Sequence, residues 1–229
     1  MSAKDHIQNE VIKARQNFSK FYTDLRTEAY SNRDKYSEED IRCGFFVILY
    51  QDVLWPSLVL EEFSQVINEK TSVKEFLMMD DIPRLQFLFS YNQITRMSFL
   101  TKFMFDIEDF LKSIMAASGN PMDDGYYVMT EKLLKLLDLY DKQNHGILNA
   151  PAQIRNSLHN GGFASYDFEV IIKEKTFKFK RGERIVFASW DNIYLILDEL
   201  VNLIKIIIKN KKNLICKRYF KWLCQSLGF

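Results

Sequence analysis

The chain has 229 residues, of which 47% are hydrophobic and 27% are charged, and it contains only 8 Gly and 4 Pro. A chain of this length buries enough surface for one core without disulfides or metals, and so few Gly and Pro argue against disordered, collagen-like and turn-rich all-β proteins. The net charge of +1 excludes a uniformly basic nucleic-acid coat, although residues 201–229 hold seven Lys or Arg and no acidic residue.

The cysteines and the N-terminus bear on the compartment. Cys43, Cys216 and Cys224 are odd in number and widely spaced, which favours a reducing compartment without a disulfide framework. Cys43 lies in an apolar stretch and is predicted to be a buried structural thiol. The first ten residues are polar, unlike a signal peptide, and we find no run of about 18 uncharged apolar residues. We therefore expect a cytoplasmic protein that does not enter a membrane.

Helical periodicity dominates the first part of the chain. Residues 5–30 carry an apolar stripe at 3–4 spacing and predict a helix, followed by a turn at 31–35. Residues 37–40 resemble a helix start because acidic residues follow a serine. The next segment, 41–67, is densely apolar, and we expect Pro56 to break or kink it.

The middle of the chain predicts further helices with clear boundaries. A break at 80–83 precedes a long helix over 94–117, which should end at the Ser118–Pro121 turn. Residues 132–140 predict a short helix, followed by a loop around His145 and Gly146. The remaining elements expected are a helix over 148–160 with Pro151 in its first turn, short strands at 168–172, 176–180 and 184–187, and a final helix over 192–209 capped by Ser189.

These elements predict a mainly α protein, a helical bundle with a small β-hairpin inserted before the last long helix. We divide it into an N-terminal helical extension packed on the bundle (1–79), a helical domain (80–210) and a basic amphipathic C-terminal tail (211–229). For the tail, a helix that packs its apolar side and leaves its lysines in water is favoured over one that tracks RNA or lies on a membrane.

The informative segment for chemistry is 154–162. Arg155 and His159 are one helical turn apart and share a face, while Ile154 and Leu158 share the neighbouring apolar face. A histidine can move the proton of a ribose 2′-hydroxyl, and an arginine can stabilise the charge that builds on the adjacent phosphodiester. This chemistry needs no metal and no cofactor. The alternative is an ordinary exposed helix end, because such pairs also occur by chance.

Arg155-Asn156 followed by His159 on a helix resembles the motif of the HEPN superfamily, which consists of α-helical domains that include many RNA-cutting toxins and antiviral effectors. Residues 105–111 are similar to the acidic position on the family's first bundle helix. The later helix, hairpin and closing helix also fit, so that the resemblance covers roughly residues 94–210. It implies a metal-independent endoribonuclease of HEPN type that acts on RNA as a defence or stress effector.

The resemblance also implies residue roles and partners. Arg155 and His159 would be catalytic, with Asn156 and Asn160 in support. Glu108 and Asp109 would orient Arg155, or else belong to a solvated helix face. In this superfamily the site usually forms where two copies meet, which implies a homodimer, and an antitoxin or another regulatory protein is a further expected partner.

The sequence departs from the family pattern at one point. Fewer residues separate Arg155 from His159 than in the family, and Asn160 occupies the position nearest the family's histidine. A second hypothesis therefore stays open, namely a non-catalytic dimeric module that binds RNA, a nucleotide or a protein partner through the same polar groove.

Overall fold

A computed structural model describes residues 3–38, 40–68, 81–120 and 124–210 of the protein. These residues form helices and one small sheet, which confirms the predicted mainly α bundle with a hairpin before the last helix. In chain order the elements are α1 (Ala3–Lys35), α2 (Ile41–Asn68), α4 (Asp81–Ala117), α5 (Tyr126–Leu136), α6 (Lys142–His159), β1 (Phe168–Ile172), β2 (Lys175–Phe179) and α7 (Trp190–Lys209).

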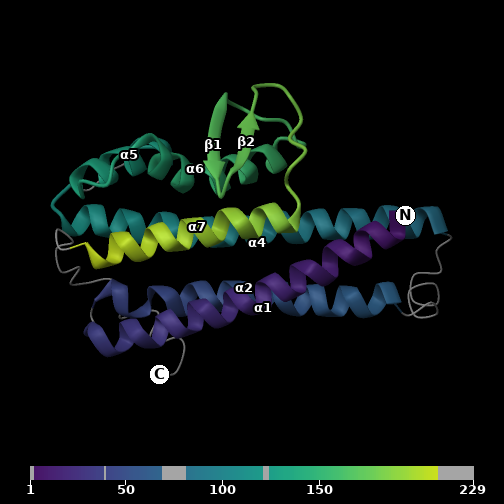
Figure 1. Ribbon diagram of the computed structural model, residues 1–229, viewed down its shortest axis with the longest axis horizontal. Helices are drawn as coiled ribbons and strands as arrows, with labels where there is room; N and C mark the ends of the chain where they lie inside the picture. The colour runs from purple at the N-terminus through teal and green to yellow at the C-terminus, as the bar shows by residue number, and fades with distance from the viewer. Residues whose placement is uncertain (1–2, 39, 69–80, 121–123, 211–229) are drawn as a thin grey trace.

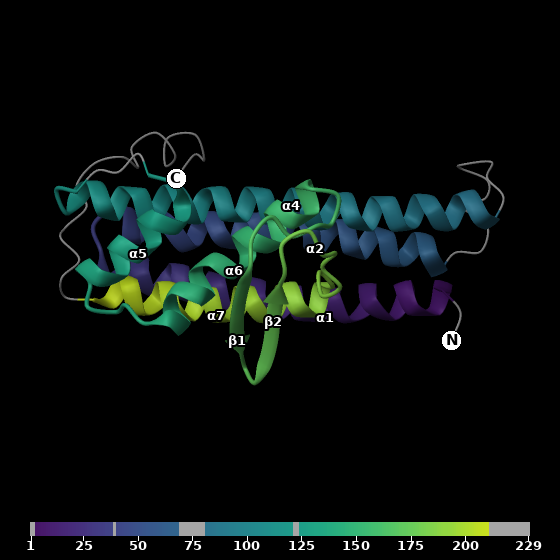
Figure 2. The ribbon, with the colours of Figure 1, turned by 90° about the horizontal axis from the view of Figure 1, so that it is seen from above.

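The elements lie in three tiers, which Figures 1 and 2 show from two sides. The antiparallel pair α1 and α2 forms one tier, and the long helix α4 lies beside α7 in the middle tier. Helices α5 and α6 and the β-hairpin form the third tier, which we name the cap. The cap covers the face of α4 and α7 that is turned away from α1 and α2, so α6 lies at the outer surface with one side on the core.

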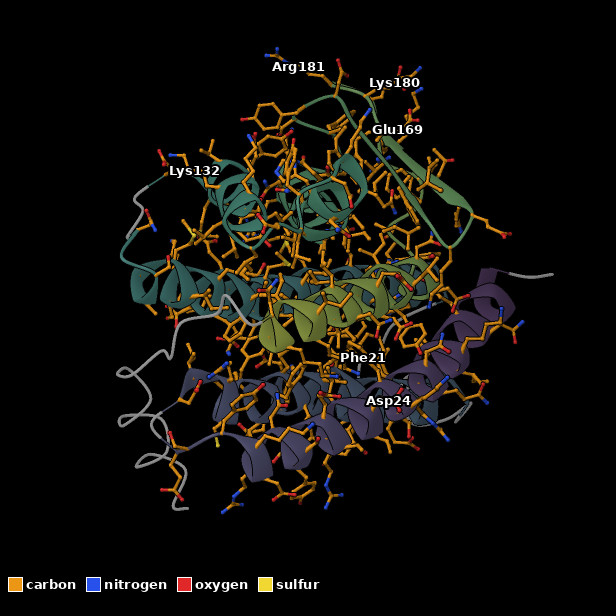
Figure 3. The ribbon with its side chains drawn as sticks, turned by 60° about the vertical axis from the view of Figure 1, so that its left-hand side comes forward. Phe21, Asp24, Lys132, Glu169, Lys180 and Arg181 are labelled. Carbon is orange, nitrogen blue, oxygen red and sulfur yellow. The ribbon has the colours of Figure 1, made fainter. Side chains whose placement is uncertain are left out.

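One hydrophobic core runs through all three tiers and joins the predicted N-terminal extension to the rest. Aromatic rings fill the interface between α1 and the middle tier. Phe18 meets Trp190 edge to face, with ring centroids 5.2 Å apart, and Phe21 meets Tyr194 at 5.8 Å. Figure 3 shows Phe21 on the inner side of α1 and Asp24 one turn further along this helix. Cys43 is buried, as predicted.

Two predicted interruptions of the N-terminal helices are wrong. The turn expected at residues 31–35 is helical, because α1 continues to Lys35 and Asn32 of this turn is buried. Pro56 does not end α2, which continues for twelve residues beyond it to Asn68. The buried residues Val53 and Leu60 hold this helix on the core on both sides of the proline, so packing offsets the hydrogen bond that proline cannot donate.

Helix boundaries in the middle of the chain also differ from the prediction. Helix α4 ends at Ala117 as expected but begins at Asp81, thirteen residues before the predicted start. Helix α5 spans Tyr126–Leu136 and not residues 132–140, and the chain then reverses at Asp138, whose φ is +56°. A helix therefore precedes the loop that leads into α6.

Helix α6 begins earlier than predicted. Asp141 caps it by accepting a hydrogen bond from the backbone N–H of Asn144 at 2.6 Å. The predicted loop at His145 and Gly146 is therefore the second turn of this helix, and Pro151 lies near its middle and not in its first turn. The glycine suggested a loop, but in the folded protein it lies against the hairpin.

The hairpin pairs Phe168 with Phe179 and Ile172 with Lys175 in an antiparallel register. The third strand expected at 184–187 is absent from the described residues, where Arg184 makes only an isolated bridge to Phe163. The hairpin tip lies against α7, because Lys173 Nζ is 2.5 Å from a carboxylate oxygen of Asp198 and 3.2 Å from one of Glu199.

Helix α7 begins at Trp190, and Ser189 caps it as predicted by accepting a hydrogen bond from the backbone N–H of Asn192. The Trp190 indole N–H donates to Asn92 on α4 at 2.7 Å, which ties α7 to its neighbour. The basic tail predicted at residues 211–229 lies outside the described residues.

Candidate functional site

The C-terminal end of α6 positions the side chains that the sequence singled out. Ile154 and Ser157 are buried, and Leu158 packs against the core, as its apolar spacing predicted. These contacts fix the rotation of the helix, so that Arg155 and His159 lie on its outer side.

Arg155, Asn156, His159 and Asn160 line one open, shallow depression on the protein surface. Two further residues complete it. Thr101 comes from α4, and Ser165 comes from the loop that follows α6. The four residues that the sequence predicted on this helix are therefore brought together around a solvent-accessible hollow.

Arg155 is half-buried and held by its neighbour Asn156. Its Nε and Nη2 atoms donate to Asn156 Oδ1 at 3.1 and 3.0 Å. One edge of the guanidinium is thereby fixed, and Nη1 remains for another acceptor. Such a fixed fork suits a phosphate group, whose oxygens match the geometry of a planar guanidinium.

His159 is exposed, and α4 fixes its position. Its Nε2 atom forms a hydrogen bond with Thr101 Oγ1 at 3.1 Å across 58 residues of sequence. The other ring nitrogen, Nδ1, has no hydrogen-bond partner within the described ranges. This nitrogen can exchange a proton with a bound ligand.

The turn after α6 brings Ser165 to the depression. Gly161 and Gly162 have φ values of +65° and +92°, a left-handed conformation that ends the helix where the sequence predicted. Asn160 donates from Nδ2 to the Phe163 carbonyl at 3.2 Å and so stabilises this turn. Its amide is thus committed to the loop.

Glu108 and Asp109 are not brought to Arg155. Glu108 pairs with Lys112 on its own helix at 2.7 Å, and Asp109 is exposed. No ion pair joins Arg155 to either carboxylate in the part of the chain that the structure describes. Asn156 holds the guanidinium in the place where the sequence predicted an acid.

A partly buried tyrosine, Tyr126, feels the charges of both Glu108 and Arg155. The Tyr126 hydroxyl donates to the Leu148 carbonyl at 3.0 Å. Burial raises the pKa of Tyr126 above its ordinary range, and the charge of Glu108 adds to this shift while that of Arg155 opposes it. Tyr126 therefore stays a neutral hydrogen-bond donor to the backbone of α6.

Sequence reasoning missed Thr101 and Ser165 as lining residues. A threonine in an apolar helix gives no signal of its own, and its contact with His159 joins helices that are far apart in the chain. Ser165 follows the glycine turn, and only the path of that turn reveals its position.

A second charged cluster lies next to Thr101, between α4 and α2. Lys102 contacts Asp106 on its own helix and lies 3.0 Å from Asp52 on α2. Burial, together with a hydrogen bond from the Asp106 carboxyl, raises the pKa of Asp52 to about 8, while Lys102 opposes the shift. Asp52 Oδ2 is buried without a partner among the described residues, and a proton shared with Asp106 would satisfy it. This cluster ties the two helices together.

The described residues contain no group of three or more His, Cys, Asp or Glu side chains that could hold a metal ion. One segment, Ile41–Glu62 of α2, is long and apolar enough to cross a membrane, with a mean hydropathy of 1.6. In the structure 44% of its most apolar part is buried, and a core helix of a soluble protein can have the same length and apolar composition.

Comparison with known proteins finds no relative of this chain. No family model matches the chain, and no curated protein or solved structure is significantly similar to it.

Proposed function

We propose that the protein is a metal-independent endoribonuclease of HEPN type and that the depression around Arg155 and His159 is its active site. The observation that carries the proposal is the placement of a held guanidinium and an exposed imidazole on one open hollow. RNA supplies a nucleophile next to its own phosphate, so one base and one cation are sufficient for this reaction.

In the proposed reaction, Nδ1 of His159 removes the proton of a ribose 2′-hydroxyl. The oxygen then attacks the adjacent phosphorus, a cyclic phosphate forms, and the bond to the 5′-oxygen breaks. That oxygen takes a proton from a water molecule, which reaches the open depression, and the resulting hydroxide takes the proton that His159 gained. Arg155 donates from its free edge to the phosphate oxygens as negative charge builds on them. Thr101 keeps the imidazole in place.

The test is cleavage of a labelled single-stranded RNA by the full chain in EDTA. Arg155→Ala and His159→Ala should each reduce the rate at least about a hundredfold. Arg33→Ala removes an exposed arginine on α1 and serves as the matched control, with an unchanged rate. Thermal unfolding confirms that each variant is folded. Cleavage that persists in both site variants would contradict the assignment.

The second candidate is a module that binds RNA, a nucleotide or a protein partner without cutting. It is favoured by the commitment of Asn160, which stands nearest the family's histidine position, to the Phe163 carbonyl. It predicts salt-sensitive RNA binding without products, because phosphate contacts release counterions. Product formation that depends on His159 would exclude it.

The proposal includes a cytoplasmic homodimer that an antitoxin or another regulatory protein controls. Phe105 lies one turn beyond Thr101 on α4 and is 64% exposed, so we place the contact between the two copies there. Light scattering should give twice the mass of 27.2 kDa for the protein, and Phe105→Glu should give the monomer. A wild-type protein that is monomeric at all concentrations tested would remove this part of the proposal.

A further inference from the structure

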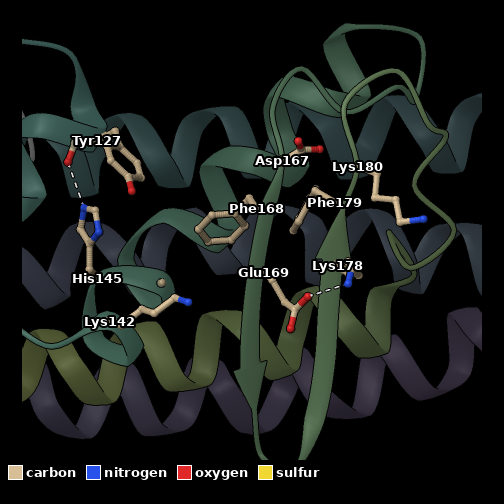
Figure 4. Close-up of a pocket in the computed structure, with 10 residues that line it drawn as sticks. Tyr127, Lys142, His145, Asp167, Phe168, Glu169, Lys178, Phe179 and Lys180 are labelled. Atoms are coloured by element: carbon tan, nitrogen blue, oxygen red, sulfur yellow. Dashed lines mark hydrogen bonds and ion pairs between the residues drawn. The ribbon is translucent and has the colours of Figure 1, made fainter.

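The N-terminal end of α6 carries a second and deeper site, which we name the hairpin pocket. It lies between α5, the first two turns of α6 and the open end of the β-hairpin, and its volume is about 550 Å³. Ligand sites in proteins commonly have volumes of this order. Figure 4 shows residues of the two helices on one side of the pocket and residues of both strands on the other.

The walls of the pocket are aromatic. Tyr127 of α5 contributes a ring that is 50% exposed, and Phe168 of β1 contributes a partly exposed ring from the opposite wall. Phe179 supports Phe168 from β2, with ring centroids 5.4 Å apart. An exposed ring backed by fixed neighbours is a surface on which a flat aromatic group can stack.

His145 holds this wall in place. The imidazole is buried, its Nε2 atom lies 3.1 Å from the Tyr127 carbonyl, and its ring lies 4.4 Å from the Tyr127 ring. A carbonyl only accepts hydrogen bonds, so Nε2 carries the hydrogen. His145 is therefore a positioning residue, and Tyr127 is the residue that can contact a ligand.

The rim of the pocket is charged, with a small positive excess, because Lys142, Lys178 and Lys180 line it against the carboxylates of Asp167 and Glu169. Glu169 is neutralised by Lys178 at 3.0 Å, and Asp167 accepts the backbone N–H of Arg181 at 2.9 Å.

Two of the three lysines are available to an anion. Lys142 makes no ion pair within the described part of the chain, and Lys180 has only a 3.4 Å contact with Glu183. Figure 3 shows Lys180 and Arg181 at the outer end of the hairpin, where a ligand can approach from solvent.

We infer that the hairpin pocket binds one nucleotide unit of single-stranded RNA, with its base against Tyr127 and its phosphate near Lys142 and Lys180. Bases stack on any aromatic face, and lysines bind phosphates as point charges, so this combination recognises a nucleotide without reading its sequence. An unpaired strand is required because a base in a duplex is already stacked.

The inference rests on the proposed function for the identity of the strand, and the fold relates the two sites. One helix carries both, and Arg155 follows Gly146 by about two and a half turns, which is a rise of roughly 14 Å along the helix axis and places the two residues on opposite sides of the helix. The rise alone corresponds to about four stacked nucleotides at 3.4 Å each, and a strand that also follows the surface around the helix needs more. The loop with Ser165 and Asp167 also contributes to both sites. A strand bound in the hairpin pocket can therefore extend to the depression around His159.

The test measures binding of a fluorescent 12-nucleotide single-stranded RNA by anisotropy, with full-length protein that carries His159→Ala to prevent cleavage. Adding Tyr127→Ala should weaken binding about tenfold. Tyr30→Ala is the matched control, since Tyr30 on α1 is 54% exposed and far from the cap, and it should leave the affinity unchanged. Equal affinities for the two tyrosine variants would overturn the inference.

The charge is tested by salt dependence. Lys142→Ala should lower the slope of log affinity against log salt by about 0.7, the value for one phosphate contact on a single strand, whereas Lys20→Ala on α1 should not. Free adenosine monophosphate distinguishes the source of the nucleotide. We expect it to compete at least about a hundredfold more weakly than the 12-mer, and competition at equal concentration would show that a free nucleotide is the occupant.

Cleavage assays separate failure of this inference from failure of the nuclease proposal. In the protein with His159, Tyr127→Ala should raise KM for the 12-mer much more than KM for a dinucleotide, because a dinucleotide reaches only the depression. A protein that cuts neither substrate but binds RNA through Tyr127 would refute the nuclease proposal alone. A protein that cuts the 12-mer with an unchanged KM in Tyr127→Ala would refute the hairpin pocket alone.

Discussion

The two ends of α6 each carry a histidine, and the two side chains have opposite environments. His159 at the C-terminal end is exposed, with one nitrogen on Thr101 and the other free of described partners. His145 at the N-terminal end is 6% exposed, and its Nε2 hydrogen is committed to the Tyr127 carbonyl. The surroundings of a histidine therefore decide whether its ring can transfer a proton or holds a neighbouring residue such as Tyr127 in place.

The largest expected effect contrasts these two histidines. His159→Ala should lower the rate of RNA cleavage by about 10² to 10⁴ and leave the melting temperature nearly unchanged, because the side chain is exposed. His145→Ala should do the reverse: it should lower the melting temperature, because it removes a buried ring and its hydrogen bond, and retain cleavage of a dinucleotide. If both folded variants lost dinucleotide cleavage to the same extent, the different roles assigned to His159 and His145 would be wrong.

The next effect concerns the support beneath the His159 end, where Asp52 fixes α4 to α2. The folded state holds a proton on Asp52 up to about pH 8, whereas the unfolded chain releases it near the ordinary value of 3.8. The folded state therefore binds more protons between these values, and stability falls as pH rises through this range. Asp52→Asn should remove this dependence and stabilise the protein by roughly 1–3 kcal/mol at pH 9.

Chemical unfolding at several pH values measures this difference. Asp34→Asn on α1 removes an exposed carboxylate and is the control. The attribution to Asp52 would fail if the wild-type protein and Asp52→Asn lost stability in parallel between pH 4 and pH 8.

A smaller effect tests the other end of α6. A methyl group at position 146 would lie 2.8 Å from Val170 Cγ2, so Gly146→Ala should push β1 away from the helix. We expect a loss of about 1 kcal/mol in the free energy of unfolding and weaker binding of the 12-mer. Because the clash involves the valine, adding Val170→Ala should cost less than the two single changes together. Additive losses would contradict the close contact.

The smallest effect concerns the hydrogen bond from α4 to His159. Thr101→Val keeps the side-chain shape and removes the hydroxyl, so kcat should fall about three- to tenfold while KM stays constant. Thr101→Ser retains the hydroxyl and should restore the rate. A rate for Thr101→Val equal to that of the wild type would show that Thr101 does not position the imidazole.

Local sequence patterns predicted much of the fold and one side of the site. The apolar spacing of Ile154 and Leu158 placed Arg155 and His159 on the outer face, and Gly161 and Gly162 marked the end of the helix. These features depend on residues within one or two turns of each other, and the sequence displays them directly.

The predictions failed where distant residues override a local signal. Gly146 indicated a loop, but its missing side chain makes room for Val170 of the hairpin. Pro56 indicated a break, but burial of the flanking residues keeps α2 helical. The contact between Thr101 and His159 joins separate elements, and so does the pocket between Tyr127 and Phe168. No spacing rule in a single sequence reveals either of them.

The anchored tip of the hairpin has a consequence for how tightly the proposed RNA strand would be held. Lys173 fixes one end of the hairpin to two carboxylates of α7, and the contact of Gly146 with Val170 fixes its middle to α6. A hairpin held at two points loses little conformational entropy when a ligand binds, so the entropic cost of binding is small. If the hairpin pocket binds RNA as proposed, removing the Lys173 ion pairs would make the hairpin mobile and should raise the dissociation rate more than it lowers the association rate.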